Sequence, residues 1–289
     1  MHIRTATARM TGPPVLDFCE IYQPSPPLAR FVECFYRLSY TAENRARLAY
    51  HRLPEGQSIL NFTIDRGVAD GRDADVRRAR LLLTGPHESL AECRSGGAVE
   101  ALVAYLKPGS LPHLFGIDGR DLAGASHPLD VVVGRDGVAL TERLAEAACI
   151  GQRLALIEAF LLARMVSDRP AMGLDLAIAI DQAVGRARID DLCARSGYSR
   201  RHLERVFLAE TGMSMKRYCR AVRVRNALAT LATATETAWI DSALASGYYD
   251  QSHLINEVRD VTGTTPRHIL STPFAPLTLS FGSIAAWRR

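Results

Sequence analysis

The sequence predicts an α+β fold, in which a β-rich, barrel-like N-terminal domain with trailing helices precedes an all-α domain of two helix-turn-helix units joined by a long helix. Three observations lead to this prediction. Short apolar runs interrupted by glycine, proline and charge occupy the first part of the chain, and apolar residues at helical spacing occupy the rest. The phrase SGYSRRHL also returns later as SGYYDQSHL. A length of 289 residues is enough for two domains that each bury a core.

The composition, with 47% hydrophobic and 23% charged residues, is that of a soluble globular protein. No apolar run approaches the ~18 residues that a membrane-spanning helix needs. The N-terminal stretch MHIRTATARMTGPP lacks the apolar block of a secretory signal. We therefore expect a cytoplasmic protein with no membrane partner. The formal net charge of +4 permits nucleic-acid binding but is too small to indicate it alone.

Strands are expected within residues 1–135, the predicted β-rich domain. The runs SILNFTI at 58–64, RLLLTG at 80–85 and ALVAYLKPG at 101–109 are typical of strands. Turn sequences such as DRG, SGG and KPG separate these runs. They favour a small sheet or barrel whose strand number the pattern does not fix.

Helices are expected in residues 136–166, with a break at Gly151 between two of them. The second helix carries an apolar stripe made of Leu154, Ile157, Leu161 and Met165. Two interpretations of this stripe remain open: it covers its own domain, or it forms the seam of a homodimer. The segment SDRPAMG at 167–173 combines charge, proline and glycine, and is the predicted linker.

The first copy of the repeated phrase predicts a helix, a short turn and a second helix. Gly197 stands where the first helix should end, because glycine adopts the left-handed conformation that closes a helix. Ser199 is a suitable N-cap for the second helix. The apolar positions of the two helices are Ile189, Leu192, Cys193, Leu203, Val206 and Phe207.

The second copy keeps these offsets with one extra residue in the turn. Gly247 matches Gly197 as the turn glycine, and Asp250 replaces Ser199 as the N-cap. The apolar positions and the exit glycine return at Leu254, Val258 and Gly263. The two copies lie within residues 174–272, the predicted all-α domain, and residues 273–289 form a tail.

A helix over residues 214–231 is expected to join the copies. At about 1.5 Å per residue it spans roughly 27 Å. This length approaches the ~34 Å of one turn of B-DNA. Two units on one rigid spacer can therefore enter successive major grooves on one face of a duplex.

These residues resemble the AraC/XylS family of transcription regulators, through LCARSGYSRRHLERVFLAETGMSMKRYCRAVRV and ALASGYYDQSHLINEVRDVTGTTPRHIL. The resemblance implies a bacterial, nucleoid-associated activator that is not an enzyme and needs no cofactor, with double-stranded DNA and RNA polymerase as partners. It also implies that the second helix of each unit is the recognition helix. The matching base-contacting positions are Arg201, Glu204, Arg205, Gln251, Ser252, Ile255 and Asn256.

The second copy departs from the family pattern in three places. Ser242 replaces a buried aliphatic residue, Asn256 replaces a common arginine, and Val258 replaces phenylalanine. A smaller and more polar core should hold the second recognition helix less firmly. We therefore expect the first unit to dominate sequence discrimination.

Basic residues within and directly after the first unit are candidates for contact with DNA phosphates. The predicted phosphate-contacting residues are Arg200, Lys216, Arg217 and Arg220. Arg223 and Arg225 follow on the same helix, and Arg223 also matches a family position for which a structural role is the alternative. For each of these residues, an ordinary charged surface remains the other interpretation.

The N-terminal half is similar to the sensor-like domain of one group of these regulators. The stretches RFVECFYRL, HRLPEGQSILNF and LKPGSLPHLFGIDGRDL carry this resemblance. It implies a domain that binds a small effector and mediates self-association as a homodimer. It does not name the effector.

Two other function classes remain as alternatives: a cupin-type or alkyl-transfer enzyme, and an architectural DNA binder of low specificity. Metal catalysis requires clustered ligands, whereas the histidines stand singly and are expected to be exposed or hydrogen-bonded; they include His51, His87, His113 and His127. GASHP lacks the last glycine of a GxSxG nucleophile motif. The six cysteines show no CxxC spacing. The sequence therefore predicts neither a catalytic residue nor a metal site.

Overall fold

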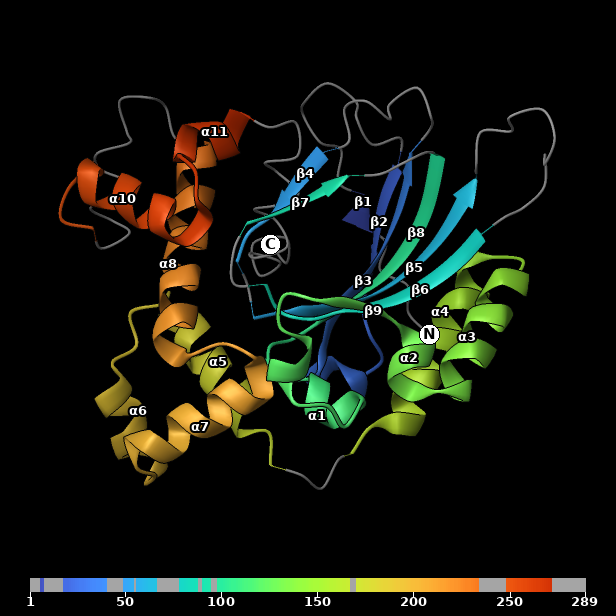
Figure 1. The fold of residues 1–289 in the computed structure, drawn as a ribbon, viewed down its shortest axis with the longest axis horizontal. Helices are drawn as coiled ribbons and strands as arrows, with labels where there is room; N and C mark the ends of the chain where they lie inside the picture. The colour runs from blue at the N-terminus through green and yellow to red at the C-terminus, as the bar shows by residue number, and fades with distance from the viewer. Residues whose placement is uncertain are drawn as a thin grey trace.

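The computed structural model describes residues 6–7, 18–40, 49–54, 56–66, 78–87, 90–94, 98–166, 170–233 and 248–271. Figure 1 shows a curved sheet with N-terminal helices along one side and the C-terminal helices grouped on the other. The predicted α+β fold, with strands first and helices after them, is confirmed.

Seven antiparallel strands form the main sheet, in the order β1 (Ala6–Thr7), β2 (Phe18–Tyr22), β3 (Val32–Tyr40), β8 (Ala98–Leu106), β5 (Ser58–Arg66), β6 (Arg78–Thr84) and β9 (Ser126–Pro128). A separate pair consists of β4 (Ala49–Arg52) and β7 (Ala91–Arg94). The three strand-like runs of the sequence are confirmed as β5, β6 and β8. Among the described strands β1 and β9 stand at the two ends of the order, so this sheet is open and not closed into a barrel.

Alternation along the central strands buries both faces of the sheet. On β5, Leu60 belongs to the main core and Ile59 belongs to a second apolar cluster. On β8, Leu102 and Val103 divide between the same two clusters. Successive side chains of a strand point to opposite faces, so both faces of these strands are covered.

Three helices cover one side of the sheet: α2 (Leu129–Val133), α3 (Arg135–Glu146) and α4 (Ile150–Arg164) (Figure 1). The apolar stripe of α4 points inward, since Leu154 is 3% exposed and Ile157 and Leu161 are 0% exposed. These three residues therefore cover their own domain, which supports the first of the two interpretations of the stripe. The break between the helices lies at 147–149, where Ala147 and Cys149 have extended backbone, and Gly151 lies within α4.

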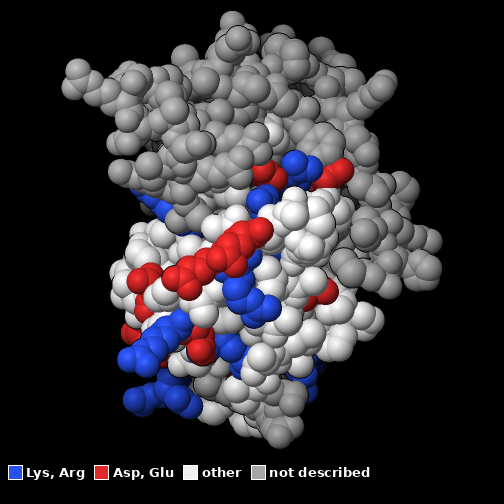
Figure 2. All heavy atoms as spheres, turned by 90° about the vertical axis from the view of Figure 1, so that its right-hand side faces the viewer, with Lys and Arg blue, Asp and Glu red and all other residues white. Residues whose placement is uncertain are grey.

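The outward face of this side of the molecule carries charges of both signs. Figure 2 shows acidic and basic side chains interspersed on it. One such pair joins two helices, with Nη1 of Arg164 on α4 lying 3.2 Å from Oδ2 of Asp136 on α3. The DNA backbone is uniformly negative, so a face that carries charges of both signs is not favourable for binding DNA.

The C-terminal part consists of α5 (Met172–Gln182), α6 (Ile189–Ser196), α7 (Arg200–Thr211), α8 (Met215–Thr233), α10 (Gln251–Thr262) and α11 (Pro266–Ser271). The long helix expected between the two copies is confirmed as α8, which in Figure 1 runs between α7 at one end and α10 and α11 at the other. Some predictions lie outside the described residues: those for Ser242 and Gly247, for 167–169 of the linker and for the tail at 273–289.

The two parts of the chain touch directly. A Cβ added to Gly119, in the short helix η3 (Gly119–Leu122), would lie 2.5 Å from the backbone nitrogen of Gly212 at the end of α7. Leu53 packs into the apolar cluster between α8 and α10. Leu174 of α5, conversely, belongs to the core of the N-terminal part. The α7 and α8 helices are therefore anchored on the N-terminal part.

Candidate nucleic-acid interface

The first helix-turn-helix unit consists of α6 and α7. Gly197 has φ 72° and ends α6 in the left-handed conformation, as predicted. The backbone N–H of His202 donates to Oγ of Ser199, the N-cap of α7, at 3.3 Å. Gly212, at φ 68°, ends α7 after 12 residues. The local sequence thus sets both ends of the helix.

The second unit repeats these ends on α10. The backbone N–H of His253 donates to Oδ1 of Asp250 at 2.7 Å, so Asp250 is the N-cap. Gly263, at φ 77°, ends α10 after 12 residues. The two recognition helices therefore have the same length between equivalent caps.

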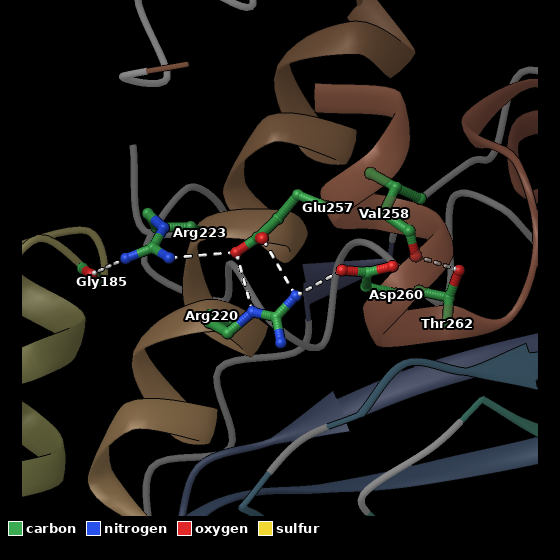
Figure 3. A network of polar contacts seen from close by, with 7 residues as sticks. All are labelled: Gly185, Arg220, Arg223, Glu257, Val258, Asp260 and Thr262. Atoms are coloured by element: carbon green, nitrogen blue, oxygen red, sulfur yellow. Dashed lines mark hydrogen bonds and ion pairs between the residues drawn. The ribbon is translucent and has the colours of Figure 1, made fainter. Parts of the chain in front are cut away.

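A threonine near the end of each recognition helix extends the repeat. The hydroxyl of Thr211 donates to the carbonyl of Phe207 at 2.7 Å, and the hydroxyl of Thr262 donates to the carbonyl of Val258 at 2.7 Å (Figure 3 shows the second). Each threonine oxygen also accepts the backbone N–H two residues further on, at 3.3 Å. Sequence reasoning missed this feature, although a Thr-Gly pair at the same offset in both copies signals it.

The predicted base-contacting residues lie on the solvent side of the two helices. The packed side holds Leu203 and Phe207 on α7, and Leu254 and Val258 on α10, each 0% or 1% exposed. Val258 is thus as well buried as Phe207, although it is smaller. The exposed residues are Arg201, Glu204, Arg205, Gln251, Ser252 and Asn256, whereas Ile255 is half-buried.

Charged side chains on α7 are partly engaged with one another. Nε of Arg200 lies 2.9 Å from Oε1 of Glu204, and Nη2 of Arg205 lies 3.5 Å from Nδ1 of His202. The Arg200–Glu204 pair is exposed, so its contribution to stability is small. Breaking these exposed contacts to bind DNA would therefore cost little free energy.

Two of the predicted phosphate contacts stand on the first turn of α8. Lys216 and Arg217 are exposed, and the backbone N–H of Arg217 donates to Oγ of Ser214 at 3.3 Å. Together with Arg220 they line a pocket of about 360 Å³ next to Asp260 on α10. The start of α8 therefore offers two exposed cations between the recognition helices.

Arg220 has a different environment from these two cations. Its Nε and Nη2 donate to Oε1 and Oε2 of Glu257 at 3.1 Å and 3.0 Å, and Nη2 donates to Oδ2 of Asp260 at 3.2 Å (Figure 3). Arg223 and Arg225 are engaged as well, through Glu257 and Asp181 respectively. These three arginines bind carboxylates within the protein and do not form a free charged surface.

Glu257 is a half-buried residue whose side chain is 11% exposed and whose carboxylate lies between two guanidinium groups. Burial favours the neutral acid, but the hydrogen bonds from Arg220 and Arg223 outweigh it and hold the pKa of Glu257 below its usual value. The hydrogen bond to Glu257 in turn raises the pKa of Arg220. Both shifts favour the charged forms of Glu257 and Arg220.

His113, expected to be exposed or hydrogen-bonded, is neither. Its side chain is 0% exposed, on the short helix α1 (Leu111–Leu114), and its ring stacks on Phe31 at 4.9 Å. Both ring nitrogens are buried without a hydrogen-bond partner, and Nε2 lies 3.9 Å from Oε2 of Glu210 on α7. The expectation is wrong because this environment comes from packing between two distant parts of the chain.

Other kinds of functional group in the described residues would be reactive cysteines, metal-binding clusters and membrane-spanning helices. Among the cysteines whose side chains are described, Cys34 and Cys219 are buried, Cys193 is half-buried and Cys149 is exposed, and none of these four forms a disulfide. The part of the chain that the structure describes holds no group of three or more side chains arranged to bind a metal ion. None of its helices is long and apolar enough to cross a membrane.

Comparison with known proteins gives two matches to family models. Residues 192–272 match the model of a helix-turn-helix domain, and residues 20–128 match that of a domain of unknown function (DUF6597). No curated protein matches the chain. The first match begins in α6 and ends just after α11, so it contains both recognition helices and α8.

Some solved structures are similar to parts of the chain. The C-terminal domain of AraT, a response regulator from Geobacillus stearothermophilus, is 19% identical over 37% of this chain and 88% of that chain, with a TM-score of 0.32. ToxT from Vibrio cholerae is 13% identical over 82% and 96%, with a TM-score of 0.41. ToxT with a bound unsaturated fatty acid is 12% identical over 78% and 90%, with a TM-score of 0.40.

The resemblance stated from the sequence is confirmed by the helix-turn-helix match, which spans the repeated phrases. The match also favours a regulator over an enzyme. The chain thus joins an AraC-type helix-turn-helix DNA-binding domain, at residues 192–272, to an N-terminal domain of unknown function, at residues 20–128.

Proposed function

We propose that the chain binds a specific DNA sequence by placing α7 and α10 in two successive segments of the major groove. The observation that carries this proposal is the equivalence of the two helices, which share their caps, their length and their exposed face. The helix between them, α8, has 19 residues and is roughly 28 Å long at about 1.5 Å per residue. This length is close to the ~34 Å between major-groove segments on one face of B-DNA.

Selection of binding sites from a random duplex pool tests this proposal. A regulator of this kind should enrich a two-part motif of about 20 base pairs, with its subsites about one helical turn apart. A one-part motif would contradict the use of both units. Enrichment of no motif would favour the alternative of an architectural DNA binder with low specificity.

Modulation by a small effector in the N-terminal part is the second half of the proposal. A pocket of about 660 Å³ lies between α3 and α4, a volume within the usual range for small-molecule sites. Its walls are mostly apolar and include Leu156 and Phe160, with Arg143 and the ion pair of Arg164 and Asp136 also lining it. This lining suits a small molecule with an apolar body and an anionic group that pairs with Arg143.

The pocket is connected to α7 through α1. Leu114 of α1 lines the pocket, and the neighbouring His113 contacts Glu210 of α7. Val166, also in the lining, donates its backbone N–H to the carbonyl of His113 at 2.9 Å. A ligand that displaces α1 would therefore alter the contact that holds the end of the first recognition helix.

Thermal unfolding in the presence of aromatic and medium-chain carboxylates tests the effector proposal. A ligand of this pocket should raise the Tm of the wild-type chain, because it binds the folded state. It should raise the Tm of Arg143→Ala much less. An equal rise in both proteins would place the ligand elsewhere.

The family resemblance also supports activation through RNA polymerase and self-association as a homodimer. The buried stripe of α4 is not available for this contact, so self-association would use another surface of the N-terminal part. Sedimentation of the full chain with and without its operator tests the homodimer. A single monomeric species under both conditions would contradict it.

A further inference from the structure

A network of polar contacts connects the second recognition helix to α8 (Figure 3). Both oxygens of Glu257 accept from Arg220, which lies 37 residues earlier in the chain. Oε1 also accepts from Nη2 of Arg223, at 3.0 Å. Glu257 is thus held by guanidinium groups from two successive turns of α8.

The same network extends to the first unit. Nη1 of Arg223 donates to the carbonyl of Gly185, at 3.2 Å, in the turn between α5 and α6. Val184 in this turn has φ 55°, a strained conformation for a β-branched residue. A Cβ added to Gly185 would lie 2.4 Å from the carbonyl oxygen of Cys219 on α8. The turn is therefore packed closely against α8, and this packing places the carbonyl of Gly185 next to Arg223.

The polar and apolar contacts of α10 restrict its position in different ways. Val224 and Leu228 of α8 pack against Leu254 and Val258 of α10. Such contacts are not directional, so they hold the helices together while permitting small rotations. A bidentate arginine–carboxylate pair requires a defined plane and angle. The network consequently adds an angular restraint that the apolar core does not provide.

We infer that Glu257 sets the angle between the two recognition helices, and with it the spacing between subsites that the regulator accepts. This inference rests on the proposed function, in which α7 and α10 contact successive segments of the major groove. Glu257 itself contacts no base in this account; it is a positioning residue that acts through Arg220 and Arg223. Arg220 accordingly serves to orient α10 and does not primarily bind a phosphate.

DNA geometry makes this angle measurable. One inserted base pair moves the second subsite by ~3.4 Å and rotates it by roughly 35° about the duplex axis. A rigid pair of recognition helices cannot follow this rotation, and therefore binds one of the two subsites poorly. If the restraint is weakened, α10 can adjust and bind the displaced subsite in part.

The test compares operators that have native spacing with operators that have one base pair inserted or deleted between the subsites. The readout is the ratio of Kd on the altered duplex to Kd on the native duplex. We expect Glu257→Gln to lower this ratio by about tenfold relative to the wild type, the scale of one charge-assisted hydrogen bond. A weaker affinity for both duplexes with an unchanged ratio would overturn the inference.

Two further variants sharpen the test. Arg220→Lys keeps the positive charge but cannot form the bidentate pair, so it should lower the ratio as Glu257→Gln does; it also carries the test alone if Glu257→Gln does not fold. Asp260→Asn is the matched control, because Asp260 contacts Arg220 with a side chain that is 68% exposed, and it should retain the wild-type ratio. A wild-type ratio in both Glu257→Gln and Arg220→Lys would overturn the inference.

Failure of the proposed function gives a different result. If the wild-type chain selects no two-part motif, or shows no dependence on subsite spacing, the use of both units is wrong before any variant is compared. If the wild-type chain depends on spacing and the variants depend on it equally, the positioning role of Glu257 is wrong and the proposed function stands.

Discussion

Oε2 of Glu210 on α7 lies 3.9 Å from Nε2 of His113 on α1, and both side chains are almost completely buried. The same oxygen accepts the backbone N–H of Gly173 at 2.8 Å, at the start of α5. Glu210 therefore connects the C-terminal end of α7 to α1 and α5. The predicted base-contacting side chains in the N-terminal half of α7 stay exposed.

Replacing Glu210 with alanine should destabilise the whole chain. The substitution leaves the buried N–H of Gly173 without its acceptor, which costs about 1–3 kcal/mol. The Tm should fall by a few degrees or more in thermal unfolding, since each 1 kcal/mol corresponds to about 2–4 °C in a chain of this size. Glu204→Ala on the same helix is the control and should change Tm little, because the Arg200–Glu204 pair is exposed. Equal Tm values for the two variants would contradict this role of Glu210.

Base discrimination should depend more on α7 than on α10. Arg205 can donate two hydrogen bonds to guanine in the major groove, whereas Asn256 and Ser252 offer fewer or weaker contacts. Arg205→Ala should relax the preference at one or two base pairs by roughly tenfold to a hundredfold, and Asn256→Ala should relax it less. Affinities for single-base variants of the operator measure both effects. The opposite ranking would make α10 the principal recognition helix.

Lys216 should act on DNA without regard to sequence. If its ammonium group binds a phosphate, Lys216→Ala weakens binding to all duplexes in similar proportion. The dependence of log K on log salt should become shallower by about 0.9 for each phosphate that the protein no longer neutralises. Titrations at several salt concentrations, on operator and on unrelated duplexes, measure this slope. A weakening confined to the operator would instead assign Lys216 a role in base recognition.

The buried stripe of α4 should respond to substitution as core and not as an interface. Leu161→Ala removes a side chain that is 0% exposed and should cost about 2–5 kcal/mol of unfolding free energy. Leu162→Ala next to it, where the side chain is 37% exposed, should cost much less. Chemical denaturation of both variants makes the comparison. A monomeric but equally stable Leu161→Ala protein would restore the dimer seam.

Acid should remove part of the stability that Glu257 provides. Arg220 and Arg223 lower the folded pKa of this carboxyl despite the opposing effect of burial, while the unfolded value stays near 4.5. The charged form therefore stabilises the fold fully above pH 4.5, and this contribution disappears as the pH falls through the folded pKa. The difference in unfolding free energy between the wild type and Glu257→Gln should shrink over this interval. A difference that does not change with pH would contradict the assignment.

Local features of the fold can be predicted from the sequence because short stretches determine them. A serine or aspartate before an apolar helix and a glycine after it define an end within a few residues, which is why the structure confirms the predicted roles of Ser199, Gly197 and Asp250. The exposed side of each of the helices α7 and α10 follows from the same helical period. These assignments need no knowledge of how the helices pack.

Partners that are distant in the sequence cannot be predicted in this way. In the sequence, Arg220 looks like an ordinary surface cation. Only the packing of α10 against α8 shows that Glu257 is its partner. His113 likewise becomes buried only when α1 meets α7. The stripe of α4 allows two interpretations because an apolar face indicates that something covers it without indicating what. Tertiary packing decides all three cases.

The shared framework of α7 and α10 has a consequence for how such a regulator diversifies. In both helices the leucine and the terminal threonine lie on the buried side, so the exposed positions can change without disturbing the fold. The exposed residues of one helix can therefore be transferred to the other. In the double variant Ser252→Arg and Asn256→Arg, α10 would carry the arginines that α7 has at the matching positions. Both helices would then prefer similar bases, and the preferred operator would become a direct repeat of one subsite.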